Sequence, residues 1–264
     1  MSFYAFALAV AAVFFVSSLI MLNWGRYIGL RYLEYQHPDE IAALSTVENA
    51  VFALIGLLLA FTISGALQRF DERRQQIVQE ATAVSSAYDR LDLFGSEVAR
   101  KLQARLKDYV QARIELFRTR RHFSPWQYET VYSDQQQDKV LERKAKLWEA
   151  AIASCPNSIP LACAQALPTL ASVFEVARLR AGAIEKHPPE VIYVMLFGLG
   201  LGGSLLGGFG MARAKAPSWI HMVTFAGALT IVLYVITDME FPRMGFIRLD
   251  YFDHYLTDVY QQMR

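Results

Sequence analysis

Four long stretches without a charged side chain constrain the fold of this chain more than any other feature of its 264 residues. Each has about the 20 residues that an α-helix needs to cross roughly 30 Å of hydrocarbon. Four such stretches are too many to be the core helices of one soluble domain. We therefore predict an all-α membrane protein with four spanning helices, over residues 3–22, 50–67, 191–212 and 219–237.

The composition indicates the same class of protein. Hydrophobic residues make up 54% of the chain and charged residues 19%, with a mean hydropathy of +0.21, so the two kinds must be segregated. The first stretch lacks a preceding basic segment and a clear cleavage site, which favours a retained helix over a signal peptide. A formal net charge of +1 gives no global field for nucleic acid, so the expected partner is the lipid bilayer.

The distribution of basic residues predicts the orientation in the membrane. Lysine and arginine number 22 on the side with both termini and residues 68–190, against four on the other side. Because positive residues gather on the cytoplasmic side, we expect both termini and the large segment there. The expected parts are two spans with their loop (1–67), a cytoplasmic helical domain (68–190), two further spans (191–240) and a cytoplasmic tail (241–264).

The third stretch contains seven glycines between residues 198 and 210, which include the Gly-x-Gly-x-x-Gly letters of a dinucleotide-binding loop. Such a loop must follow a strand and open a helix, whereas these glycines lie inside a stretch of membrane length. Small residues four positions apart let membrane helices approach closely. We therefore predict helix packing, within or between subunits, and no cofactor at Gly198, Gly202, Gly203 and Gly207.

Residues 68–190 have the pattern of consecutive helices. The second span continues without a strong helix breaker to residue 94, where Gly95 is expected to end the helix and Ser96 to cap the next one. Further helices are expected on either side of a proline-bearing loop at 155–168. The extension of the second span carries a heptad seam at Ile77, Ala81, Val84, Tyr88 and Leu91.

The two cysteines, Cys155 and Cys163, lie in that expected loop. In a reducing cytoplasm we expect free thiols, and a disulfide only if the orientation is reversed. No histidine is adjacent in the sequence to complete a zinc site.

No pattern typical of an enzyme or a metal centre is present, and neither is expected. The spans carry no central ionisable residue, which disfavours a proton-coupled transporter. Glu48 is expected near the start of its helix, where it would face the helix dipole. Asp238, Glu240 and Arg243 are expected to form an interfacial salt-bridge anchor at the end of the fourth span.

The second span has a composition that suits a pore. Ala53, Leu57 and Phe61 recur at spacing four on one face. Around an axis they would form a hydrophobic constriction that gates by dewetting, and rings of arginine would attract anions. The same apolar stripe also suits helix packing, and arginine at a span end also suits a topology anchor. The anion-attracting candidates are Arg69, Arg73 and Arg74.

Two stretches, GLLLAFTISGALQRFDERRQQIVQEATAVSSAYDRLDLF and ITDMEFPRMGFIRLD, resemble a bacterial family of bestrophin-like membrane proteins. Bestrophins are four-span, all-α anion channels, and they are homopentamers whose second span forms a hydrophobic neck ending in Phe. The resemblance implies a neck at Phe61, Leu57 and Ala53, inorganic anions as partners, a pentamer, and the bacterial inner membrane. The acidic calcium-binding run of animal bestrophins has no clear counterpart, so calcium control is not implied.

Two hypotheses follow. The first is a homo-oligomeric anion channel gated at Leu57 and Phe61. The second is a non-conducting, membrane-anchored oligomeric scaffold in which the heptad seam from Ile77 to Leu91 joins copies or binds a partner.

Overall fold

The computed structural model describes residues 3–33, 38–118, 134–212, 214, 218–241 and 245–263. Within these ranges the regular structure is helical and contains no strand, which confirms the all-α prediction. Short 3-10 helices are η1 (Asp92–Phe94), η2 (Cys155–Asn157) and η3 (Asp250–Asp253). The α-helices are α1 (Phe3–Leu33), α2 (Pro38–Leu91), α3 (Ser96–Arg118), α4 (Asp134–Ser154), α5 (Pro160–Glu185), α6 (Glu190–Met211), α7 (Trp219–Glu240) and α8 (His254–Gln262).

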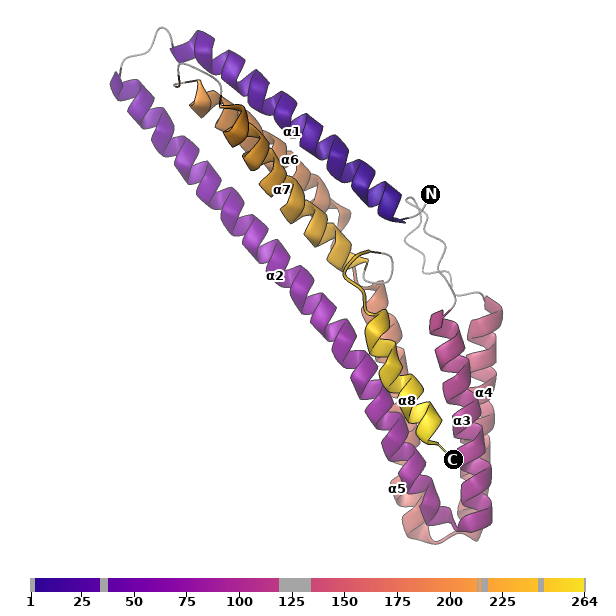
Figure 1. Cartoon of the computed structure of the whole chain (residues 1–264). Coiled ribbons are helices and arrows are strands. Elements are labelled where there is room, and N and C mark those ends of the chain that lie inside the picture. The colour runs from indigo at the N-terminus through magenta and orange to yellow at the C-terminus, as the bar shows by residue number, and fades with distance from the viewer. Residues whose placement is uncertain are drawn as a thin grey trace. The chain divides into compact units, whose positions relative to one another are not determined.

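The helices form two compact units. Unit 1 comprises residues 1–68 and 187–247, and unit 2 comprises residues 69–186 and 248–264. In unit 1, α1 packs along α6 and α7 (Figure 1). In unit 2, α3 packs along α4 and also contacts α8 (Figure 1). The tail that the sequence suggests as one part is thus divided between the two units.

Among the described residues, five helices are long and apolar enough to cross a membrane, and four of them cover the four predicted stretches to within one residue at either end. The fifth, Pro160–Ile184, is the least apolar of the five and belongs to unit 2. Its Ala166, Leu170 and Val173 are fully buried in the core of that unit. Burial inside protein accounts for these apolar residues without lipid, and four spans remain our prediction.

Helix α2 is longer than the sequence predicts, with 54 residues, because it begins at Pro38. Its far end is as predicted: η1 follows, and Gly95 has φ of +83°. A side chain is strained in that conformation. No atom of the described part of the chain lies within 4 Å of the position that a Cβ at Gly95 would occupy, so the backbone conformation is what favours glycine there.

The heptad seam of α2 lies in the core of unit 2. Ala81, Val84 and Leu91 are buried there with Leu102 and Leu106 of α3. The seam is therefore occupied by helices of the same chain.

The expected loop at 155–168 is wrong. Only η2 and two further residues separate α4 from α5, which begins at Pro160. Proline suits the first position of a helix because the N–H it lacks would have no partner there. Pro168 lies inside α5, between the buried Ala166 and Leu170. Packing of this face into the core outweighs the cost of an internal proline.

The structure holds the two cysteines in the oxidised state, whereas free thiols were expected in a reducing cytoplasm. Cys155 and Cys163 are joined by a disulfide. The short turn between α4 and α5 brings their Cα atoms to 5.7 Å, within the range that a disulfide spans. A long loop would not have fixed that distance, which is why the sequence alone did not reveal the pair.

Candidate functional site

The first half of α2 has one side that the rest of the chain leaves uncovered. Ala53, Leu57 and Phe61 all lie on it, and the exposed fractions of Leu57 and Phe61 are 51% and 65%. Among the five apolar helices, the α2 segment is the least buried. The three predicted neck residues therefore share an accessible face.

The opposite side of α2 holds the helix against the rest of unit 1. The rings of Phe52 and Phe225 on α7 have centroids 6.0 Å apart in an edge-to-face arrangement. Ile55 is buried against Gly203 of α6, and Leu59 and Ile63 join a cluster with Leu196 of α6. These contacts fix which face of α2 is turned outward.

The uncovered face of α2 differs in composition from the outer face of α1. Both faces expose large and small apolar residues, but the face of α2 also exposes the polar Ser64 and Gln68, whereas α1 exposes apolar residues such as Val13, Val16 and Ile20. Lipid tails favour a continuous cover of large apolar side chains, whereas small and polar positions favour close protein contact or water. The small or polar exposed residues on α2 are Gly56, Ala60, Ser64 and Gln68.

The structure gives the three candidate arginines different surroundings. Arg73 is 3% exposed, and its Nε and Nη2 donate to the carbonyl oxygens of Ala183 and Lys186, at 3.0 and 2.7 Å. These carbonyls lie at the carboxyl end of α5, where a cation is favourable. The guanidinium of Arg73 therefore caps a helix.

Arg74 remains accessible and Arg69 is partly exposed. Arg74 has a side chain 48% exposed, with Nη1 3.9 Å from Oδ1 of Asp71 and the guanidinium 5.5 Å from the centre of the Phe252 ring. These loose contacts leave about half of the side chain in solvent. Of the three candidates, Arg74 is the most available to a passing anion.

The predicted glycines divide into two pairs. Gly203 and Gly207 pack within unit 1, against Ile55 of α2 and Leu22 of α1 respectively. Around Gly198 and Gly202 the described residues leave open space. Their role, in one chain or between subunits, remains a prediction.

The closest helix packing in unit 1 involves glycines that the sequence pattern did not select. A Cβ at Gly208 of α6 would collide with the backbone of Leu22, and one at Gly25 of α1 with the backbone of Leu205. Gly29 lies against Phe209 in the same way. Gly25-x-x-x-Gly29 has the spacing of a packing motif and could have been found from it.

The salt-bridge anchor expected after the fourth span is wrong for Asp238. This carboxylate is 2% exposed and accepts N–H groups of Phe246 and Ile247, at 2.9 and 2.7 Å. Tyr4 of α1 donates to the carbonyl oxygen of Gly245 in the same turn, at 2.8 Å. A turn bent back onto α7 provides these donors, whereas Arg243 lies outside the described residues.

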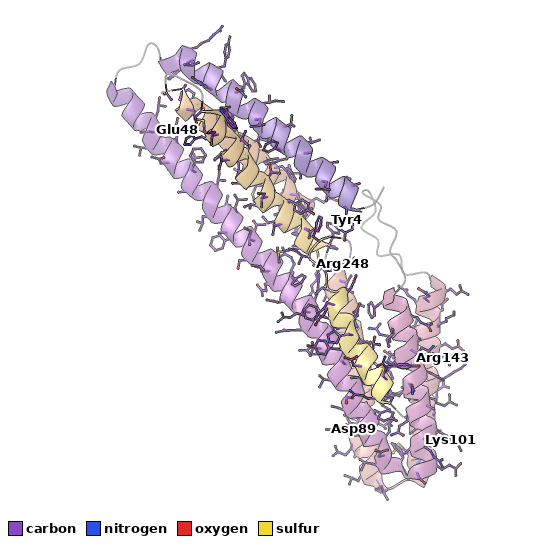
Figure 2. All side chains as sticks on the ribbon, viewed as in Figure 1. Tyr4, Glu48, Asp89, Lys101, Arg143 and Arg248 are labelled. Atoms are coloured by element: carbon purple, nitrogen blue, oxygen red, sulfur yellow. A yellow bond between two sulfur atoms is a disulfide. The ribbon has the colours of Figure 1, made fainter. Side chains whose placement is uncertain are left out.

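Glu48 does not lie near the start of its helix, because α2 begins ten residues earlier than its position. Its side chain is 9% exposed and lies against Gly210 of α6. Glu48 and Tyr4 lie toward opposite ends of unit 1 (Figure 2).

A buried ionic cluster in unit 2 was missed entirely from the sequence. Glu80 of α2 accepts from Nε of Arg113 at 2.8 Å and from Nη1 of Arg180 at 2.7 Å. Arg180 also donates to Asp253 in η3, at 2.6 Å, and its guanidinium lies 3.7 Å from the centre of the Phe117 ring. The cluster ties α2, α3 and α5 to the C-terminal segment.

The charges of this cluster determine the protonation of Glu80. Burial alone would raise the pKa of its carboxyl, but the attraction of Arg113 and Arg180 outweighs burial and holds the pKa below its ordinary value. Glu80 is therefore ionised at neutral pH.

Nearby, burial raises the pKa of Tyr109 to about 12, so its hydroxyl remains protonated. Across the described residues no group of three or more His, Cys, Asp or Glu side chains is placed to hold a metal ion.

The fold and the apolar helices define a multi-pass helical membrane protein. The profile of the bestrophin-like domain matches residues 26–251, which is most of the chain, and the chain belongs to the bestrophin-like family. A search of curated proteins found no match.

Solved structures show the same fold at low sequence identity. The bacterial bestrophin homologue from Klebsiella pneumoniae matches with a TM-score of 0.64 and 13% identity, covering 98% of each chain. A single-residue variant of that homologue matches with a TM-score of 0.63 and 12% identity, over 94% of this chain and 97% of its own. At this identity the likeness establishes the fold alone.

Proposed function

We propose that this chain forms a homo-oligomeric anion channel whose pore is lined by the uncovered face of α2. The observation that carries the proposal is the exposure of Leu57 and Phe61 on a face that also presents small and polar residues. Family membership supports it, since the chain has the bestrophin-like domain over most of its length. Five copies, the inner membrane and cytoplasmic termini are part of the same proposal.

In such an assembly each α2 contributes one side chain per level to a ring around the axis. Rings of Leu57 and Phe61 would form a narrow apolar neck that opens and closes by wetting and dewetting. Ser64 and Gln68 follow toward the end of the span and would let the ion keep polar contacts. Arg74, with Arg69, would then raise the local concentration of anions.

The surface that the scaffold hypothesis needs is not available to another chain. It requires the seam from Ile77 to Leu91 to be available to another chain, and that seam is buried in unit 2. We therefore keep the scaffold only as the negative outcome of the conduction experiment.

The test is to reconstitute the purified protein in a planar bilayer and to measure the reversal potential under a chloride gradient. A reversal near the chloride equilibrium potential is expected. Replacing Phe61 with Ala widens the neck and should raise conductance severalfold, because dewetting depends steeply on radius and polarity.

The matched control is Ile20→Ala, which removes a similarly exposed apolar side chain from α1. Its currents should equal those of the wild-type protein. Equal currents from Phe61→Ala and the wild type would place the pore elsewhere. Silence from a correctly folded oligomer would reject the channel.

A further inference from the structure

The disulfide between Cys155 and Cys163 joins the two sides of the turn between α4 and α5. Both cysteines are partly buried against the core of unit 2 and partly open to solvent. Both residues therefore lie at the edge of the core, where a small reagent can approach them.

The turn has enough other contacts to keep its shape when the sulfurs are not bonded. The Ser158 N–H donates to the carbonyl oxygen of Cys155 at 3.2 Å, and the Ala162 N–H donates to that of Ile159 at 2.9 Å. Ala151 and Ala166 anchor the two helix ends in the core and are fully buried. In the chain-entropy account a disulfide that closes so short a loop adds stability, but less than one that closes a long loop. Because the other contacts of the turn remain when the S–S bond is broken, the two cysteines stay close enough to pair again.

The two sulfurs have different electrostatic surroundings. Cys163 lies in the first turn of α5, which begins at Pro160, whereas Cys155 directly follows the last residue of α4. The amino end of a helix stabilises a thiolate and the carboxyl end does not. The Ser158 hydroxyl donates to the carbonyl oxygen of Cys155 at 3.0 Å and lies 3.4 Å from Sγ of Cys163, so it can donate to a thiolate by turning away from that carbonyl. Cys163 is thus the better nucleophile of the pair.

We propose that Cys155 and Cys163 form a reversible redox-modification site, with a peroxide as oxidant and a dithiol protein as reductant. The Cys163 thiolate attacks a peroxide oxygen, so that an S–O bond forms, the O–O bond breaks and hydroxide leaves. The Cys155 thiol then attacks the sulfenic sulfur, so that the S–S bond forms and water leaves. The protein loses two electrons and the peroxide gains them.

Reduction returns the pair to two thiols. A dithiol reductant attacks the disulfide through a mixed disulfide, becomes oxidised to its own disulfide, and supplies the two electrons and two protons. The site is independent of conduction, and its test does not require a current.

The first experiment follows the thiols of the full-length protein in cells. Free thiols are blocked at acid quench, the disulfide is then reduced, and the newly exposed thiols are tagged with a maleimide polymer that shifts the band on a gel. Both thiols should be reduced in untreated cells, oxidised within minutes of a hydrogen peroxide pulse, and reduced again after its removal. A pair that is always oxidised, or that peroxide never oxidises, overturns the proposal.

The second experiment assigns the nucleophile. Dimedone traps sulfenic acid, and Cys155→Ser should be labelled at Cys163 at least about tenfold more than Cys163→Ser is labelled at Cys155. Limiting alkylation of the reduced wild-type protein, read by mass spectrometry, gives the same comparison without a substitution. Equal labelling in both assays overturns the assignment.

A third variant tests whether the Ser158 hydroxyl assists the Cys163 thiolate. Ser158→Ala should slow formation of the disulfide severalfold, since the thiolate loses a donor. Ser154→Ala is the matched control, because its hydroxyl donates to the carbonyl of Ala150, one turn back along α4. Equal rates for Ser158→Ala and Ser154→Ala would contradict the role of Ser158.

Discussion

At Gly208 the space for a side chain is already filled by the backbone of Leu22. Gly208→Ala should therefore force α6 away from α1 and destabilise the protein by about 1 to 3 kcal/mol. Thermal unfolding in detergent measures the change. Gly198→Ala is the matched control, since a Cβ there meets no atom of the described residues within 4 Å. An unchanged melting temperature for Gly208→Ala would contradict the packing described.

Glu80 holds two buried arginines, so its neutral replacement leaves their charge uncompensated. Glu80→Gln should cost about 3 to 5 kcal/mol, which at about 2 °C per kcal/mol lowers the apparent melting temperature by roughly 6 °C or more. Glu97→Gln, which removes an exposed partner of Lys101, is the control and should leave the melting temperature unchanged.

The carboxyl of Glu80 also predicts that the stability of the protein depends on pH. Because the folded pKa of Glu80 lies below its ordinary value, the stabilisation is complete above the unfolded pKa of about 4.3 and is lost as pH falls through the folded pKa. The melting temperatures of the wild type and Glu80→Gln should therefore converge in acid. A gap that stays constant from pH 7 to pH 3 would contradict the assignment.

Single residues were predictable where the local pattern decides their role. Gly95 was found because one turn needs its conformation, and the buried face of α2 because its spacing is helical. The cluster of Glu80, Arg113 and Arg180 was not found, because these residues are separated by 33 and 100 positions from Glu80. No local spacing encodes that distance.

At the scale of the helix, Arg73 of α2 stabilises the carboxyl end of α5. Arg73→Gln removes charged donors to two terminal carbonyls and should cost about 1.5 to 3 kcal/mol. Arg74→Gln is the matched variant one position on and should keep the melting temperature. It should instead lower the chloride conductance, more at low than at high salt, because salt screens an exposed charge. A lower melting temperature for Arg74→Gln and an unchanged one for Arg73→Gln would contradict these two roles.

Helix existence was more predictable than helix limits. Apolar length identified α1, α2, α6 and α7, whereas the start of α5 was placed too late because prolines at 160 and 168 suggested a loop. The first is favourable at a helix start, and tertiary packing tolerates the second. The sequence did not predict which face of α2 remains uncovered. That face is set by the helices that pack against α2 in unit 1, and the spacing of apolar residues along α2 does not identify those helices.

For the whole molecule, the open space at Gly198 makes a prediction about assembly. If copies pack there, Gly198→Leu should dissociate the oligomer, as measured by native mass spectrometry, while the helical content stays unchanged. Ala12→Leu adds nearly as much bulk at an exposed position on α1 and should leave the oligomer intact. An intact oligomer in Gly198→Leu would show that this face meets lipid.

The pairing of α1 with α6 has a consequence for biosynthesis. Gly25 lies against the backbone of Leu205, about 180 residues further along the chain, which a ribosome adds in roughly 10 to 35 s. During translation α1 is therefore in the bilayer before its packing partner, α6, has been made. Closure of this pair is a late event after insertion, and defects at Gly25 or Gly208 should first be visible as degradation of newly made protein.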